Sequence, residues 1–343
     1  MTKPRFELGG ENVYPGTEKT IYLPLPSLYD WTPMDLPVHV ICGKYKGPTL
    51  LITAAIHGDE INGIEIIRRL LKKKGLRKMN GTIIAIPIVN VYGFLYQKRT
   101  LIDKRDLNRC FPGSPKGSIA ARLANIISSE ILPLATHAID LHTGSNHRFN
   151  LPQIRTNIDM PENEKLALAF NSPLILHSVY RDGSLREYAN EKGIPFLLYE
   201  AGEAYRFDEL SIRTGVNGIL SVMSALEMIM GGRYRVKQFT PTISRQSHWI
   251  RAHASGIIRP VKKVGQKIIK GQTIAIIANP ITKEEFKLTT PISGIIIGDN
   301  KLPLIHEGEA LFHVATFETM KVVEEQLETI QEAFNLTDDD AIY

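Results

Sequence analysis

Short apolar runs that alternate with helix-like patterns are the feature that most restricts how this chain can fold. Nearly continuous apolar segments of strand length lie at 50–56, 81–90, 138–144 and 195–200. Apolar residues recur at helical spacing over 61–71, 119–132, 185–192 and 212–230. Strands with no polar face are typical of parallel sheets covered on both sides, and strands alternating with helices indicate an α/β fold. We predict a mixed, largely parallel central sheet with helices on both faces.

The sequence changes character near residue 241, where short β-like pieces with glycine turns replace the helical patterns. Within this part, Ser-Gly-Ile-Ile at 255–258 recurs at 293–296, which indicates two similar halves. The segment resembles the barrel-sandwich fold of lipoyl- and biotin-carrier domains but lacks the lysine hairpin that those domains modify. We predict a large domain over 1–240, opened by an irregular lead-in with short strands. A small all-β barrel-sandwich-like domain with a structural role follows over 241–316, and an acidic helical tail over 317–343.

Composition narrows the functional classes. The 343 residues are 43% hydrophobic and 22% charged, as in ordinary soluble proteins, and no segment reaches the roughly 20 apolar residues of a membrane span. The net charge is only +5, and the one basic run, over 68–74, falls on the polar side of a predicted helix. Nucleic acid and membrane are therefore not expected partners. Two cysteines, Cys42 and Cys110, and an N-terminus without an apolar signal segment predict a cytoplasmic location.

Histidines and carboxylates gather at the ends of three predicted strands. His57 and Glu60 follow the first strand, His142 ends another, and Glu200 ends a third. Ligand sites of open α/β sheets lie at these carboxyl ends. A His/Glu/His set binds zinc and leaves one position open, as catalytic sites do. Taken alone, a His-x-x-Glu pair often only caps or solvates a helix, and Glu200 could equally be a general base or a buried salt-bridge partner.

Two further features could support such a site. Asp140 lies two residues before His142, on the same strand face, and could orient its imidazole; it could equally fix a loop backbone. Residues 99–113 combine arginines with an asparagine, groups that can hold a carboxylate or an oxyanion. A charged surface loop explains Lys104 and Arg105 well, but explains the Asn-Arg-Cys-Phe-Pro-Gly end at 108–113 poorly.

Four motifs in order carry a family resemblance: His-Gly-Asp-Glu at 57–60, Asp-Leu-Asn-Arg at 106–109, Asp-Leu-His-Thr-Gly at 140–144 and Tyr-Glu-Ala-Gly at 199–202. Together they resemble the succinylglutamate desuccinylase/aspartoacylase family, a branch of the carboxypeptidase-A-like zinc hydrolases. The resemblance implies a zinc hydrolase domain over 1–240 with one Zn²⁺ per chain. His57, Glu60 and His142 would be its ligands and Glu200 the general base and acid. Asn108 and Arg109 would hold the substrate carboxylate, and Arg99 would stabilise the carbonyl oxygen, with Arg105 as competitor.

The leading hypothesis is a deacylase that removes an acetyl, succinyl or similar group from a small N-acyl amino acid or related amide. A metallocarboxypeptidase acting on peptides is the alternative hydrolase. A non-catalytic binding or carrier protein using the C-terminal β segment is the alternative of another class. An acidic acyl group would need another cation, for which the candidates are Arg148, Arg155, Arg181, Arg186 and Arg206. Among them we favour Arg186 as a substrate-binding residue. The acyl group, the amine and a possible homo-oligomer are not determined by the sequence.

Overall fold

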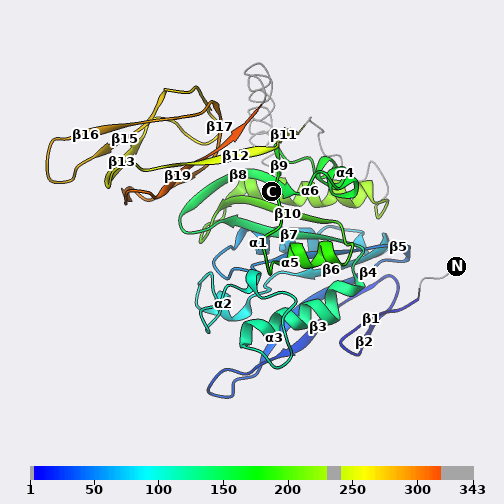
Figure 1. Ribbon diagram of the computed structural model, residues 1–343. Helices are drawn as coiled ribbons and strands as arrows, with labels where there is room; N and C mark the ends of the chain where they lie inside the picture. Colours follow the sequence, from blue (N-terminus) through cyan, green and yellow to red (C-terminus); the bar gives the residue numbers. More distant parts are fainter. Residues whose placement is uncertain (1–3, 230–240, 318–343) are drawn as a thin grey trace.

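The computed structural model describes residues 4–229 and 241–317. Four parallel strands form the middle of its large sheet, in the order β10 (Phe196–Glu203), β7 (His137–Gly144), β5 (Tyr45–Ala54) and β6 (Asn80–Ile86) (Figure 1). They correspond to the four apolar runs of the sequence. Within the described ranges no helix has the length and apolar character to cross a lipid bilayer.

Antiparallel strands extend this parallel centre on both sides. β4 (Met34–Cys42) pairs with β6, and β3 (Thr17–Leu25) pairs with β4 at the edge of the sheet. On the other side β8 (Arg148–Thr156) runs antiparallel to β10, and β9 (Leu174–His177) runs parallel to β8. A separate hairpin joins β1 (Phe6–Leu8) and β2 (Glu11–Val13). The predicted mixed sheet with a parallel centre is therefore confirmed.

Helices cover both faces of the large sheet. Side chains alternate between the two faces along each strand, so these apolar strands present apolar side chains to both faces. One face packs against α3 (Ile119–Ile126) and α5 (Leu185–Glu191), through strand residues such as Leu51, Ile84 and Ile86. The other face packs against α1 (Asn62–Leu71), α4 (Pro161–Phe170) and α6 (Glu209–Ala225), through their neighbours Leu50, Ile52 and Ile83. The continuous apolar runs are thus divided between two cores.

The C-terminal strands continue the large sheet and also build a second one. β17 (Gly294–Asn300) pairs with β8, β19 (Ala310–Thr316) with β17, and β12 (Gln246–Arg251) with β19. The short strands β11 (Thr242–Ser244) and β14 (Lys267–Ile268) pair with β9 and β17. The second sheet is antiparallel, with β16 (Glu285–Thr289), β15 (Thr273–Ala278), β13 (Gly256–Pro260) and β18 (Leu304–Ile305) in that order (Figure 1). The two repeated Ser-Gly-Ile-Ile segments lead into β13 and β17. The domain division at 240 and 316 stays a prediction.

Several elements differ from the sequence-based expectation. The lead-in contains a nine-residue strand, β3, because Pro24 lies on the edge strand and Pro37 lies where β4 has no contact with β6. The predicted helix over 212–230 ends at Ala225, where Glu227 adopts a left-handed φ of 56° and closes the helix. β8, α4 and the short helix α2 (Val91–Leu95) had no counterpart in the prediction. The predicted helical tail lies outside the described residues except at Phe317.

Candidate active site

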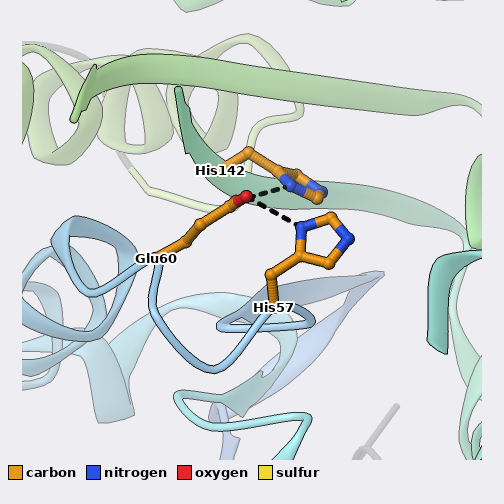
Figure 2. A group of neighbouring side chains, drawn as sticks. All are labelled: His57, Glu60 and His142. Carbon is orange, nitrogen blue, oxygen red and sulfur yellow. Dashed lines mark hydrogen bonds and ion pairs between the residues drawn. The ribbon is translucent and has the colours of Figure 1, made fainter. Parts of the chain in front are cut away.

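Three buried side chains converge at the carboxyl edge of the parallel strands. His57 and Glu60 lie in the loop between β5 and α1, and His142 lies on β7. One ligand atom from each residue can be chosen so that all lie within 4.8 Å of one another, and Figure 2 shows the three side chains pointing toward each other. The Nδ1 atoms of His57 and His142 lie 2.8 and 2.9 Å from the two carboxylate oxygens of Glu60. Imidazole and carboxylate donors at this spacing can hold one metal ion.

The strand register explains why Glu200 joins this group. β5, β7 and β10 are adjacent, and Glu200 on β10 is the register partner of His142 on β7. Register partners on neighbouring parallel strands lie about 5 Å apart and point to the same face. The structure therefore brings together the three strand ends, as the sequence predicted. Glu200 is largely buried and forms an ion pair of 2.6 Å with Arg155 on β8, a partner that the sequence did not indicate.

A carboxylate supports each imidazole from behind. Asp106 Oδ1 lies 3.0 Å from His57 Nε2, and Asp140 Oδ2 lies 2.8 Å from His142 Nε2. Burial alone would lower the pKa of His142, but the negative charges of Asp140 and Glu60 outweigh it and raise that pKa well above its usual value. Each imidazole thus has Nδ1 directed at Glu60 and Nε2 fixed by a carboxylate, the arrangement that orients histidine ligands. Of the two roles left open for Asp140, the contact with the His142 imidazole is present, whereas the contact of Asp106 with His57 was not predicted.

Replacing Asp140 by asparagine should weaken metal binding without dismantling the cluster. The carboxylate also accepts a hydrogen bond of 2.7 Å from Thr53 Oγ1, which an amide oxygen can keep. Without the negative charge of Asp140, the imidazole of His142 would donate its electron pair less strongly to a metal ion. Such changes typically cost about 10- to 100-fold in metal affinity. A zinc titration against a competing chelator measures this. Asp299→Asn, a buried carboxylate outside the cluster, is the matched control and should leave the affinity unchanged.

Gly58 allows the loop that carries His57 and Glu60 to pack closely against α2. A Cβ at this position would lie 2.1 Å from the carbonyl carbon of Gly93 and 2.2 Å from the amide nitrogen of Phe94. Both contacts are backbone atoms, so the loop that carries His57 or the helix must shift. We expect Gly58→Ala to lower the free energy of unfolding by about 1–3 kcal/mol and also to weaken zinc binding.

Urea unfolding and zinc titration test the Gly58 prediction together. Gly193→Ala is the control: its Cβ would meet nothing within 4 Å, but its φ is +69°, so only backbone strain of about 1–2 kcal/mol is added. Both variants should be destabilised, and only Gly58→Ala should bind zinc less tightly. Unchanged zinc affinity in Gly58→Ala would show that the close packing of Gly58 on α2 does not position His57 and Glu60 for zinc.

Arg99, rather than Arg105, reaches the cluster. The guanidinium of Arg99 donates to Asp106 Oδ2 at 2.9 Å and to Glu60 Oε1 at 3.2 Å. The Arg105 side chain is 62% exposed and its nearest carboxylate, Asp103, lies 3.8 Å away. The geometry thus favours Arg99 of the two arginines that the sequence left in competition for the carbonyl oxygen.

Asn108, Arg109 and Arg186 lie along one side of the site. Asn108 Oδ1 accepts a hydrogen bond of 2.9 Å from the Leu185 amide at the start of α5. The guanidinium of Arg109 donates to the Asn108 carbonyl oxygen. Arg186 is buried and donates to the carbonyl oxygens of Arg155 and Val179 at 3.0 and 2.8 Å. Burial and the nearby Arg155 lower the pKa of Arg186 to about 10.

One cavity of about 470 Å³ is lined by all eight predicted site residues: His57, Glu60, Arg99, Asn108, Arg109, His142, Arg186 and Glu200. Besides Arg99, Arg109 and Arg186, four more arginines line it: Arg148, Arg155, Arg181 and Arg251. Of the five candidate cations for an acidic acyl group, only Arg206 is outside the lining; its side chain is 75% exposed and faces Glu203.

The C-terminal strands complete the cavity wall. Trp249 and Arg251 on β12, and Ala310 and His313 on β19, line the cavity. No sequence pattern indicated these contacts, because they depend on β12 and β19 joining the large sheet through β17 and β8. The cavity is therefore closed on one side by residues that lie more than 100 positions from the His57/Glu60/His142 cluster along the chain.

The fold and the site define a class: an α/β protein with a buried His/Glu/His cluster, a nearby carboxylate and an arginine-lined cavity at its strand ends. The pattern of the succinylglutamate desuccinylase/aspartoacylase catalytic domain matches residues 46–226. This covers more than half of the 343 residues. The chain therefore belongs to the succinylglutamate desuccinylase/aspartoacylase family, a family of deacylating hydrolases, as the four sequence motifs predicted.

Individual relatives agree with this assignment. An N-alpha-acetyl-L-2,4-diaminobutyric acid deacetylase from Halomonas elongata is 26% identical over 268 residues, covering 74% of this chain and 78% of that protein. A succinylglutamate desuccinylase/aspartoacylase crystal structure from Rhodobacter sphaeroides is 25% identical, with a TM-score of 0.78 over 88% of this chain and 96% of that one. The product-bound ectoine utilization protein EutE (DoeB) from Ruegeria pomeroyi has a TM-score of 0.80 at 22% identity, over 88% and 95% of the chains. The last similarity concerns the fold alone.

Proposed function

We propose that this protein is a zinc-dependent amidohydrolase that removes an acyl group from a small N-acyl amino acid or related amide. The observation that carries the proposal is the convergence of His57, Glu60 and His142 within 4.8 Å, in a cavity that also contains Glu200 and the Asn108–Arg109 pair. Its volume of about 470 Å³ is in the range of small-molecule sites. The Halomonas relative is named for the removal of an acetyl group from an amino acid.

The residues present fit a zinc ion. Two imidazole nitrogens and a carboxylate converge from three directions, and each imidazole is fixed from behind by a carboxylate. Three protein ligands leave one coordination position open, which is the pattern of catalytic rather than structural zinc. When bound, zinc polarises a carbonyl group and lowers the pKa of a water molecule to about 7. His57, Glu60 and His142 would hold one ion per chain.

Glu200 supplies the proton transfers in this proposal. Its carboxylate takes a proton from the attacking water and returns it to the nitrogen of the leaving amine, so that the amide bond breaks into a carboxylic acid and a free amine. The ion pair with Arg155 fixes the orientation of the Glu200 side chain. Arg99, next to Glu60 and Asp106, donates to the carbonyl oxygen as negative charge develops on it.

Asn108 and Arg109 would hold the substrate carboxylate. An arginine fork and an amide donor recognise a carboxylate by charge-assisted hydrogen bonds, each contributing about 1.5–3 kcal/mol. We expect Arg109→Lys to raise KM by about 10- to 100-fold with a smaller change in kcat, because lysine cannot form the planar fork. Steady-state kinetics measure the split. A change in kcat alone would contradict a binding role.

A substrate screen with zinc supplied tests the proposed function as a whole. N-acetyl and N-succinyl amino acids would be compared with short peptides of similar charge, with zinc content measured on the same samples. Hydrolysis of the N-acyl amino acids, lost on chelation and restored by zinc, is the expected result. Cleavage of peptides alone would instead favour a metallocarboxypeptidase. Absence of both zinc and hydrolysis would favour a binding protein.

A further inference from the structure

Gln153 lies beside Glu200 on the face of the large sheet that carries the cavity. The two residues are direct register partners on the antiparallel strands β8 and β10. The next partners on this face, Arg155 and Leu198, both line the cavity. Every second residue of a strand points to the same side, so Gln153 points to the cavity side as well. Directly opposed side chains have Cβ atoms about 4.5–5.5 Å apart, which brings the Gln153 amide within reach of the Glu200 carboxylate.

The Gln153 side chain is fully buried and forms no hydrogen bond. It is 0% exposed, and neither its carbonyl oxygen Oε1 nor its amide nitrogen Nε2 has a hydrogen-bond partner. Among residues 4–229 and 241–317, no other side chain has two buried polar atoms in this state. Buried polar groups are almost always bonded, because an unbonded one loses its hydrogen bonds to water without replacement. Gln153 therefore destabilises the fold at this position relative to an apolar side chain of its size.

The packing around Gln153 does not explain its amide. Leu151 lies two residues before it, Leu174 is its register partner on β9, and both leucines belong to one apolar cluster. Gln153 is not among the residues that line the cavity, so a substrate in the cavity would not contact it. The ion pair of Arg155 with Glu200 already joins β8 to β10. Of the two register partners of Gln153, only Glu200 is polar.

Glu200 needs a different partner once it has accepted a proton. In the structure Arg155 donates to Glu200 Oε2 at 2.6 Å, an interaction that is strong because the carboxylate is charged. In the proposed reaction Glu200 takes a proton from water and becomes a neutral carboxylic acid. Its attraction to Arg155 is then weaker, while its O–H must point to the leaving amine. A second hydrogen-bond donor beside the carboxyl group would hold it in that orientation.

We propose that Gln153 is a positioning residue for Glu200: its amide binds the protonated carboxyl group and directs the O–H to the leaving amine. Nε2 donates to the carboxyl oxygen that does not carry the proton, so the O–H stays free to donate into the cavity. The proton then passes from Glu200 to the amine nitrogen as the amide C–N bond breaks, and Gln153 itself is unchanged. The inference rests on the proposed deacylase function and adds to it a residue that does not touch the substrate.

Replacing Gln153 by methionine tests the proposal, because methionine has nearly the same size but cannot donate a hydrogen bond. The zinc-loaded full chain is assayed with the best N-acetyl amino acid of the substrate screen. We expect kcat to fall by about tenfold, the effect of one hydrogen bond in the transition state, and KM to change by less than about threefold. The urea midpoint should equal or exceed that of the wild type, since an apolar group replaces an unbonded amide among apolar neighbours. A purely structural role predicts the opposite pattern, a lower midpoint with kcat retained.

A thioester analogue of the same substrate separates proton delivery from other effects. In this analogue sulfur replaces the amide N–H, whereas the acetyl group and the carboxylate are kept. The thiolate leaves without needing a proton. Gln153→Met should therefore reduce kcat for the thioester by less than about threefold, against about tenfold for the amide. Equal losses on both substrates would overturn the proposal, because general damage to the site affects both.

A double variant shows whether Gln153 acts through Glu200. The Glu200→Gln enzyme has no carboxyl proton to deliver, so adding Gln153→Met should lower its residual kcat by less than about twofold. A further loss of about tenfold in the double variant would mean that the two residues act independently, and would contradict the proposal.

Thr242→Val is the matched control for Gln153→Met. Thr242 is the register partner of Leu174 on β11, is 0% exposed, and its Oγ1 has no hydrogen-bond partner either. The change removes an unbonded buried polar atom two strands further from Glu200. It should not lower the urea midpoint and should leave kcat and KM unchanged on both substrates. A loss of kcat comparable to that of Gln153→Met would show that any change in this part of the sheet is harmful, and would overturn the proposal.

The wild type and the variant together distinguish the failure of this inference from that of the proposed function. If the zinc-loaded wild type hydrolyses no N-acyl amino acid, the deacylase proposal fails, and the role of Gln153 fails with it. If the wild type hydrolyses the amide and Gln153→Met retains kcat, only the Gln153 proposal is wrong. If Gln153→Met loses kcat and its urea midpoint falls as well, Gln153 supports the fold rather than the proton transfer, and the deacylase proposal stands without it.

Discussion

Replacement of His142 by glutamine is expected to abolish stable zinc binding, and with it the deacylase activity. His142 contributes one of only three ligand atoms in the cluster, so the loss of zinc affinity should exceed the roughly 100-fold upper end seen when only a supporting group is removed. Metal analysis after dialysis measures the bound zinc. The same preparation should show no hydrolysis above background at zinc concentrations that saturate the wild type.

The His142 variant must also be shown to fold, because His142 links two buried carboxylates. Its ring nitrogens lie 2.9 Å from Glu60 and 2.8 Å from Asp140, and removing one partner of such a buried network can cost about 3–5 kcal/mol. Glutamine retains a hydrogen-bonding side chain and limits this loss. Circular dichroism checks the fold, and thermal unfolding with and without zinc supplies a second measurement. Zinc should raise Tm in the wild type and leave the variant unchanged; an equal rise in both would exclude His142 as a ligand.

The sequence predicted the centre of this site because the chemistry follows from strand topology. β5, β7 and β10 are continuous apolar runs, each ending in polar residues, and parallel strands bring their carboxyl ends to one edge. No further information was needed to place His57, His142 and Glu200 near one another. The Asp140–His142 contact follows from the same logic, since residues two apart share a strand face.

The opposite wall could not be predicted, because it depends on long-range pairing. β8 contains Pro152 between Asn150 and Gln153, a composition that argues against an interior strand. The proline is tolerated because β17 pairs with β8 only up to Asn150 and β9 only from Gln153. Arg148 and Arg155 therefore enter the cavity from a strand with no clear local signal. Trp249 and His313 enter it only because β12 and β19 extend the same sheet.

Asp106 shows a related limit. Its motif was recognised, but its contact with His57 joins residues 49 positions apart across a loop with no periodic pattern. α4 was also missed. Its segment is only weakly amphipathic and buries Asn163, whose side chain accepts a hydrogen bond of 3.0 Å from the Phe196 amide. Asp106 and Asn163 thus each make a specific tertiary contact through a polar side chain, and hydrophobic periodicity does not detect such contacts.

Glu200→Gln should reduce kcat by about 10²- to 10⁴-fold, the usual contribution of a general acid–base group. Glutamine has nearly the same size and can still accept a hydrogen bond from Arg155, so the side chain should keep its place. It cannot take a proton from water or return one to the leaving amine. Because Glu200 is not a member of the His57/Glu60/His142 cluster, zinc content should be unchanged and KM should change by much less than kcat.

Glu203→Gln is the matched control for Glu200→Gln. Glu203 lies three residues further along β10, is also buried, and faces His147 and Arg206 rather than the cavity. It should retain most of the wild-type kcat, since the same chemical change is made on the same strand without reaching the site. Comparable losses in the two variants would show that disturbance of β10, not removal of a base, explains the effect. A Glu200→Gln enzyme with full zinc and near-normal kcat would transfer the role of base to another group.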